Sequence, residues 1–133
     1  MAFKRDYLAM VEIKAINTLK DVSIQLGKAF DGFEFCEDTS GRFEEVPAFA
    51  AKKGNVNLTL FGIPEGEESD VYILELSCDK SVDRGVFGGI IGLKLIKIIP
   101  KELVVGDNGY TDISSYLVSY INSVSNLECW IAE

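Results

Sequence analysis

The chain contains no histidine, and this absence removes several kinds of catalytic site. A Ser-His-Asp triad is impossible without it, and a cysteine nucleophile would lack its usual activating base. Histidine is also the side chain best suited to proton transfer near neutral pH. We therefore expect that the protein is not an enzyme.

Cysteine is scarce as well. Three cysteines occur, Cys36, Cys78 and Cys129, far apart and with no Cys-x-x-Cys pair. An odd number at such spacings argues against a disulfide framework and against a zinc site. We interpret them as free buried thiols that behave as small hydrophobes, and we expect no metal ion and no cofactor.

Long hydrophobic runs are missing too. The longest apolar stretch, Val86 to Ile99, is interrupted by Lys94 and Lys97, and it falls short of the roughly 20 apolar residues that a membrane-spanning helix needs. The first residues after Met1 show no apolar segment or cleavage site typical of a signal peptide. We expect a cytoplasmic protein with no membrane partner.

What the sequence does contain is typical of one globular domain. The chain has 133 residues, of which 47% are hydrophobic and 26% are charged. This length suits a single domain spanning 1–133, and the composition argues against intrinsic disorder.

The charge is uneven along the chain. The net charge is -8, and 13 acidic but only four basic residues lie between Asp31 and Asp83, while the rest of the chain is nearly balanced. Such a field repels nucleic acid and attracts a basic partner. The plainer interpretation, that acidic side chains only keep the protein soluble, stays open.

Alternating apolar residues predict strands over Tyr7–Ile16, Val56–Ile63 and Val71–Cys78. The last two are close in sequence and predict an antiparallel hairpin, whose connecting loop carries four acids. Shorter extended segments are expected at Phe33–Cys36 and at Phe43–Ala51, where Pro47 confines the second to an edge or a bulge.

Two helices are expected from apolar residues that recur with a period of 3.6. For the first, Asn17 and Thr18 offer an N-cap, apolar residues follow from Leu19 onward, and Gly32 can end the helix. The second is capped by Asp112 and runs over Ile113–Val124. Together the elements predict an α+β fold, an antiparallel sheet of about five to six strands with two helices packed on one face.

The glycine-rich run Gly85–Gly92 does not match a known phosphate-binding pattern, because it lacks the Gly-Lys-Ser/Thr ending and the G-x-G-x-x-G spacing. We interpret it as a flexible loop or a bulged entry to a strand. The β-prone segment Gly92–Ile99 is expected to be that strand, and Leu127–Ala132 is ambiguous between a helical tail and a short strand.

Other candidate chemistry has simpler explanations. The adjacent acids Glu37-Asp38 and Glu44-Glu45 give no indication of the cleft that paired catalytic carboxylates need. The segment Asp107–Asp112 lacks the full ligand series of a calcium loop and is explained by a turn and a helix cap. Tyr116 and Tyr120 are expected in the core, with Trp130 partly exposed.

In size, acidic middle segment and α+β layout, the chain resembles small acidic bacterial immunity proteins that neutralise toxins. The resemblance is one of overall character, without a diagnostic motif. It implies a protein-binding module of the immunity or antitoxin type, with a basic toxin as partner and no nucleic acid. It also implies that the partner faces two acidic segments, and these contain the candidate binding residues Glu37, Asp38, Glu44, Glu45, Glu65, Glu67, Glu68 and Asp70.

A second hypothesis is a small-molecule-binding protein or a small enzyme. Its pocket would lie between the sheet and the helices, with the Gly85–Gly92 segment as a lid. The two hypotheses differ in whether charge at Glu67 and Glu68 matters for binding.

Overall fold

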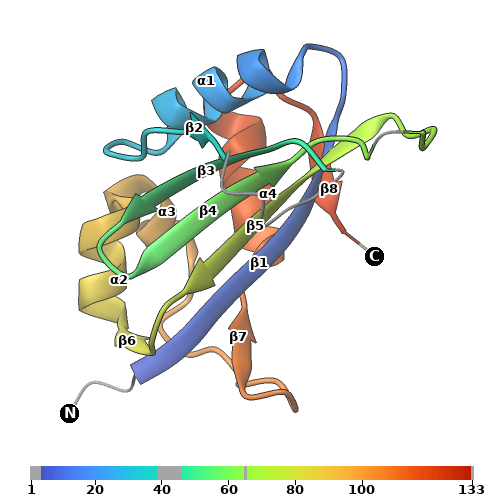
Figure 1. Cartoon of the computed structure of the whole chain (residues 1–133). Helices are drawn as coiled ribbons and strands as arrows, with labels where there is room; N and C mark the ends of the chain where they lie inside the picture. Colours follow the sequence, from blue (N-terminus) through green and yellow to red (C-terminus); the bar gives the residue numbers. More distant parts are fainter. Residues whose placement is uncertain (1–3, 39–45, 65, 133) are drawn as a thin grey trace.

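A computed structural model describes residues 4–38, 46–64 and 66–132. Over these residues it contains four helices and eight strands in a mostly antiparallel sheet, which confirms the α+β class (Figure 1). The helices are α1 (Leu19–Ala29), α2 (Arg84–Ile91), α3 (Leu93–Ile98) and α4 (Ser114–Val124). The strands are β1 (Lys4–Lys14), β2 (Cys36–Glu37), β3 (Ala48–Lys53), β4 (Val56–Phe61), β5 (Val71–Cys78), β6 (Val82–Asp83), β7 (Tyr110–Asp112) and β8 (Cys129–Ile131).

The sheet is built around the long strand β1. The strand order is β2-β3-β4-β5-β1-β6, and β7 and β8 also pair with β1. Antiparallel pairing joins Ala9–Lys14 of β1 to Val71–Leu76 of β5. Because β8 pairs with the same part of β1, opposite Val11 to Ile13, it lies on the other edge of that strand. The one parallel pair is β1 with β7.

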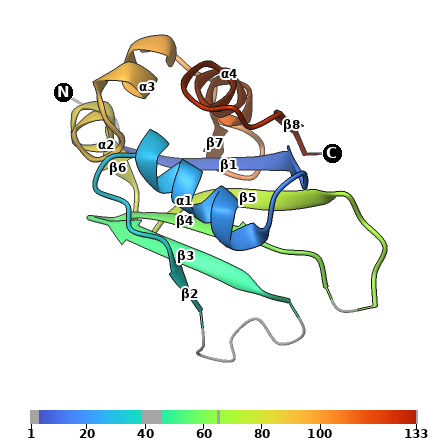
Figure 2. The same cartoon turned by 90° about the horizontal axis from the view of Figure 1, so that it is seen from above.

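All four helices lie on one side of the sheet, as the view from above shows (Figure 2). The sheet residues that face them are apolar and fully buried, for example Val11, Leu58 and Leu74. They pack on buried helix residues such as Leu26 and Leu117. The alternation of buried and more exposed residues along β1, β4 and β5 follows directly from the period of two in a strand with one wet face.

The predicted hairpin is confirmed as β4 and β5, which pair antiparallel from Val56 opposite Cys78 to Phe61 opposite Ile73. The first predicted helix is also present, and the Thr18 side chain accepts a hydrogen bond from the Asp21 backbone N–H. It ends at Ala29, earlier than expected.

The expected loop and strand across residues 85–99 are wrong, because this segment forms α2 and α3. The Asp83 carboxylate caps α2 by accepting from the Val86 N–H at 2.8 Å. Gly92 has φ 99°, a conformation that ends α2 and lets α3 start in a new direction. Packing between the two helices overrides the β propensity of the aliphatic residues.

The expected two helices are two too few, and the expected five to six strands are two or three too few. Four of the strands, β2, β6, β7 and β8, have only two or three residues, too few for a periodic pattern to reveal. Leu127–Ala132 contains the short strand β8. No strand forms over the described residues 103–105, although a short one is possible there by composition.

Candidate functional site

The described ends of the two acidic segments lie at the same end of the sheet. Asp38, which follows β2, lies beside the start of β3, since its N–H donates to the Ala48 carbonyl at 2.8 Å. The segment after β4 leaves at the same place, because Ala48 pairs with Phe61 and the Gly62 N–H donates to the Pro47 carbonyl at 2.7 Å. Figure 1 shows the β4–β5 connection extending beyond the strands at this end.

The β4–β5 connection carries exposed carboxylates on an anchored backbone. Glu67, Glu68 and Asp70 are exposed. The Asp70 carbonyl accepts from the Ala15 N–H at 2.7 Å, which ties the returning chain to the end of β1. The Asp70 end of the connection is therefore held at the sheet, and the three carboxylates next to it are open to solvent.

The structure places five of the eight predicted binding residues at this acidic end, defined here as Glu37, Asp38, Glu67, Glu68 and Asp70. Glu37 is exposed in β2, and Asp38, the next residue, is partly buried. The other three, Glu44, Glu45 and Glu65, lie outside the described residues.

The opposite end of the sheet is richer in basic side chains. The β3–β4 turn lies beside α2 there, since a Cβ on Gly54 would be 2.9 Å from Ile90 Cδ1. Basic residues gather on the elements of this end, namely Lys4, Arg5, Lys52, Lys53, Lys80, Arg84, Lys94 and Lys97. Asp6, Asp79 and Asp83 also lie at this end, so the two ends of the sheet differ in the balance of charge, and basic residues outnumber acidic ones here.

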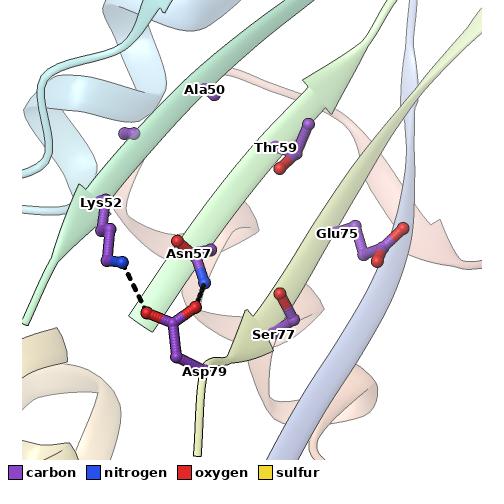
Figure 3. A pocket seen from close by; sticks show the side chains of 8 residues that line it. Ala50, Lys52, Asn57, Thr59, Glu75, Ser77 and Asp79 are labelled. Carbon is purple, nitrogen blue, oxygen red and sulfur yellow. Dashed lines mark hydrogen bonds and ion pairs between the residues drawn. The ribbon is translucent and has the colours of Figure 1, made fainter. Parts of the chain in front are cut away.

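A hollow of about 470 Å³ lies on the sheet face that the helices leave uncovered (Figure 3). It is formed by outward side chains of three adjacent strands, and its lining residues are Ala50, Ala51, Lys52, Asn57, Thr59, Glu75, Ser77 and Asp79. At its border, Asp79 pairs with Lys52 Nζ at 2.5 Å and accepts from Asn57 Nδ2 at 2.7 Å. The hydrogen bonds from Lys52 and then Asn57 hold the pKa of the Asp79 carboxyl below its usual value.

Sequence reasoning missed this hollow. The sequence pattern indicated that each polar residue occupies a solvent-facing position of a strand. It did not indicate the pairing that sets Thr59 opposite Glu75 and Asn57 opposite Ser77. Register depends on contacts between strands, and a single sequence records it only indirectly.

The glycine-rich segment is not a lid, because it is helical. A groove of about 450 Å³ lies beside it, lined by Arg84, Gly85, Gly88, Gly89, Leu93, Ile96 and Lys97. The Arg84 guanidinium donates to the Ile96 carbonyl at 2.7 Å. This side chain therefore links α2 to α3.

The cysteines differ in environment. Cys129 is buried and Cys78 is partly buried, and burial raises the pKa of each thiol to about 11. Cys36 is exposed, so the expectation that all three are buried is wrong for it, because β2 lies at the edge of the sheet. Ionised thiolate, the nucleophilic form, is therefore rare at Cys78 and Cys129 near neutral pH.

The expected positions of Tyr116 and Tyr120 in the core and of Trp130 at the surface are confirmed. Tyr120 is buried and its hydroxyl donates to the Ala29 carbonyl, while Tyr116 packs against the core. Trp130 is 41% exposed, and its indole N–H donates to the Glu12 carboxylate at 3.1 Å.

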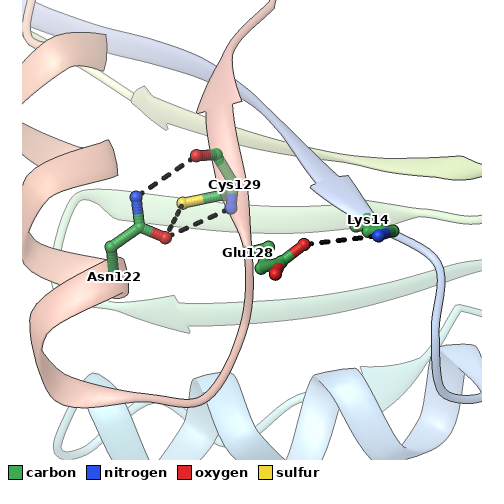
Figure 4. Close-up of polar contacts among 4 residues, drawn as sticks. All are labelled: Lys14, Asn122, Glu128 and Cys129. Atoms are coloured by element: carbon green, nitrogen blue, oxygen red, sulfur yellow. Dashed lines mark hydrogen bonds and ion pairs between the residues drawn. The ribbon is translucent and has the colours of Figure 1, made fainter.

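Neighbouring contacts fix the C-terminal strand. Asn122 of α4 bonds Cys129 through both its amide N–H and its carbonyl oxygen, and Lys14 pairs with Glu128 at 3.5 Å (Figure 4). These contacts hold β8 between α4 and β1.

In the described ranges, no group of three or more cysteines or carboxylates is arranged to hold a metal ion. Within the same residues, none of the helices has the length and apolar character required to cross a bilayer. No protein-family model, no curated protein and no solved structure matches this chain.

Proposed function

We propose that the protein is a binding module of the immunity or antitoxin type, which captures a basic protein partner at its acidic end and thereby neutralises it. The observation that carries the proposal is that described parts of both acidic segments lie at the same end of the sheet, although the β3–β4 hairpin separates them in sequence. The pairing of β3 with β4 brings Asp38 and the start of the β4–β5 connection to that end.

The charges of this surface favour a basic partner. Glu67 and Glu68 form no ion pair with any described residue, and the segment 62–71 contains no basic residue. The nearest basic residue along the neighbouring strand, Lys14, is paired with Glu128. An unneutralised acidic surface accelerates association with a basic protein and disfavours acidic competitors.

The partner acts on its target, and this chain acts by occupying the partner. Such a role needs a rigid surface of matching shape and charge, and it needs no catalytic group on the binding module. The hydrogen bonds at Gly62 and Asp70, which fix both ends of the β4–β5 connection to the sheet, support this role, because a connection held at its ends before binding loses less conformational entropy when the complex forms.

The test is affinity capture from a lysate of the source organism at low salt. The wild-type chain is compared with Glu67→Lys/Glu68→Lys, which reverses two exposed charges at the acidic end. A matched control, Glu102→Lys/Asp107→Lys, makes the same change in net charge at exposed residues away from that end.

The proposal expects one basic partner at equimolar amount, retained by the control and lost by the acidic-end variant. The activity of the purified partner, measured on the partner's own substrate, should be inhibited by the wild-type chain and not by the acidic-end variant. Equal capture by all three proteins, or no capture by any, would overturn the proposal.

A further inference from the structure

The sheet face opposite the helices offers a second surface. In the described part of the chain no helix or strand covers this face (Figure 2). Its outward side chains come from β3, β4, β5 and β1 and alternate with the buried core residues.

Two hollows meet at the centre of this face. The larger, of about 470 Å³, includes Thr59, and the smaller, of about 190 Å³, includes Met10 and Tyr110. Glu75 and Ser77 line both. In Figure 3 the Glu75 side chain stands on β5 between β4 and β1.

Glu75 is a carboxylate near the centre of this face that lacks a partner among the described residues, as does Asp6 farther along β1. The lysines of the same face are already engaged, Lys14 with Glu128 and Lys52 with Asp79. Glu12 accepts from the Trp130 indole. Glu75 forms no hydrogen bond or ion pair with a described residue, although it is partly buried beside Met10 and opposite Thr59.

Large exposed side chains flank Glu75 on the β1 side. Met10, Tyr110 and Trp130 are 42%, 44% and 41% exposed. Methionine and aromatic residues are enriched at the centres of protein interfaces, where they contribute much of the binding energy. Together with a carboxylate in a hollow, they are typical of a surface that receives a polypeptide with a cationic side chain.

We propose that this open face docks an arginine-bearing segment of the partner, with the Glu75 carboxylate accepting the guanidinium. The proposal rests on the proposed function in that the partner is a basic protein. The surface itself is separate from the acidic end, because it consists of strand residues on the open face and not of the two connecting segments.

The geometry favours arginine over lysine. A guanidinium is planar, donates two parallel N–H groups to one carboxylate, and stacks on an aromatic ring. Glu75 supplies the carboxylate, the hydroxyls of Thr59 and Ser77 supply further acceptors, and Tyr110 supplies the ring. A lysine ammonium is a point charge and uses only part of this arrangement.

The test is a titration of the ¹⁵N-labelled full chain with an octa-arginine peptide, followed by amide chemical shifts, with octa-lysine as the comparison. The variants are Glu75→Gln, which keeps the shape of the side chain, and Thr59→Arg, which places a guanidinium of the chain's own beside Glu75. Glu102→Gln is the matched control for loss of one exposed carboxylate.

We expect the amides of Met10, Glu75 and Ser77 to shift more with octa-arginine than with octa-lysine. Glu75→Gln should weaken this response by at least about threefold, as befits a charge-assisted hydrogen bond at a partly exposed site. Thr59→Arg should remove it, and Glu102→Gln should leave it unchanged.

Other outcomes overturn this inference. Shifts confined to the loop around Glu67 and Glu68 would refute the open-face site and leave the proposed function standing. The absence of shifts on either surface, or a response that Glu75→Gln does not alter, would also refute it. Failure of the lysate capture, in contrast, would refute the proposed function, whatever octa-arginine does at Glu75.

Discussion

Gly88 and Gly89 are neighbours in α2, yet a methyl group added to each would meet different surroundings. A Cβ at Gly88 would lie 2.9 Å from Ile96 Cγ1 and 3.3 Å from Ile96 Cβ, too close for a stiff β-branched side chain to yield. A Cβ at Gly89 would meet nothing within 4 Å. Gly88 is therefore needed for the packing of α2 on α3, and Gly89 is not.

The matched substitutions test that packing. Gly88→Ala should lower the free energy of unfolding by about 1–2 kcal/mol, because overpacking forces α2 and α3 apart. Gly89→Ala should raise it by up to about 1 kcal/mol through helix propensity alone. Urea unfolding measures both, and a stabilising Gly88→Ala would contradict the close contact between the two helices.

The thiols give a pH-dependent prediction. Burial raises the pKa of Cys78 and Cys129 to about 11, so both stay protonated and slow to react at pH 8, while the exposed Cys36 reacts with Ellman's reagent first. Because their folded pKa values lie above the ordinary 9.0, their contribution to stability is full below about pH 9 and is lost as the pH rises towards 11. Three equally fast thiols at pH 8 would contradict this assignment.

At the scale of elements, β8 depends on one side chain of α4. The Asn122 amide donates to the Cys129 carbonyl and accepts from the Cys129 N–H, both at 3.2 Å. These bonds take the place of a neighbouring strand on the free edge of β8. On its other edge β8 pairs with β1, and the Trp130–Glu12 and Lys14–Glu128 contacts lie beside it.

Asn122→Ala should therefore lower the free energy of unfolding by about 1–2 kcal/mol. Hydrogen exchange should quicken at Cys129 and Ile131 more than in β4 or β5. Asn126→Ala, a nearby exposed asparagine substitution, is the control and should change neither quantity. Equal exchange in both variants would argue that β8 is held by its pairing with β1 alone.

The long elements could be predicted from the sequence, and the short ones could not. β5 has the predicted bounds Val71–Cys78, because its wet and dry faces alternate over eight residues. α3 was not predicted, since the aliphatic residues of 93–98 favour a strand by propensity and become helical where Gly92 turns the chain and Ile96 packs on Gly88. The local sequence pattern determines the secondary structure of a segment where the pattern is long, and tertiary contacts determine it elsewhere.

At the scale of the whole molecule, fold and charge are arranged along the same axis. The acidic excess was visible in the sequence as one block, but the placement of Asp38 and of the start of the β4–β5 connection at the same end of the sheet depends on the pairing of β3 with β4. The hollow on the open face likewise depends on the register between the strands. The sequence could therefore identify Glu75 only as a solvent-facing residue of a strand. Acidic composition was thus predictable, and the surface it forms was not.

The separation of charge predicts how binding responds to salt. An exposed acidic surface that steers a basic partner is screened once the Debye length falls below the separation of the charges. Raising the salt from about 25 mM to about 300 mM should therefore slow association far more than it speeds dissociation. Stopped-flow or surface-based kinetics with the captured partner measure the two rates, and a purely dissociative effect would contradict electrostatic steering.

The most direct measurement is the dissociation constant of the purified partner at low salt for wild type, Glu67→Lys/Glu68→Lys and Glu102→Lys/Asp107→Lys. If the acidic end is the docking surface, the first double variant should bind at least about tenfold more weakly, and the second should bind as the wild type does, although both change net charge equally. Equal weakening by both variants would mean that only the overall charge of the protein matters, and it would contradict a docking surface at the acidic end.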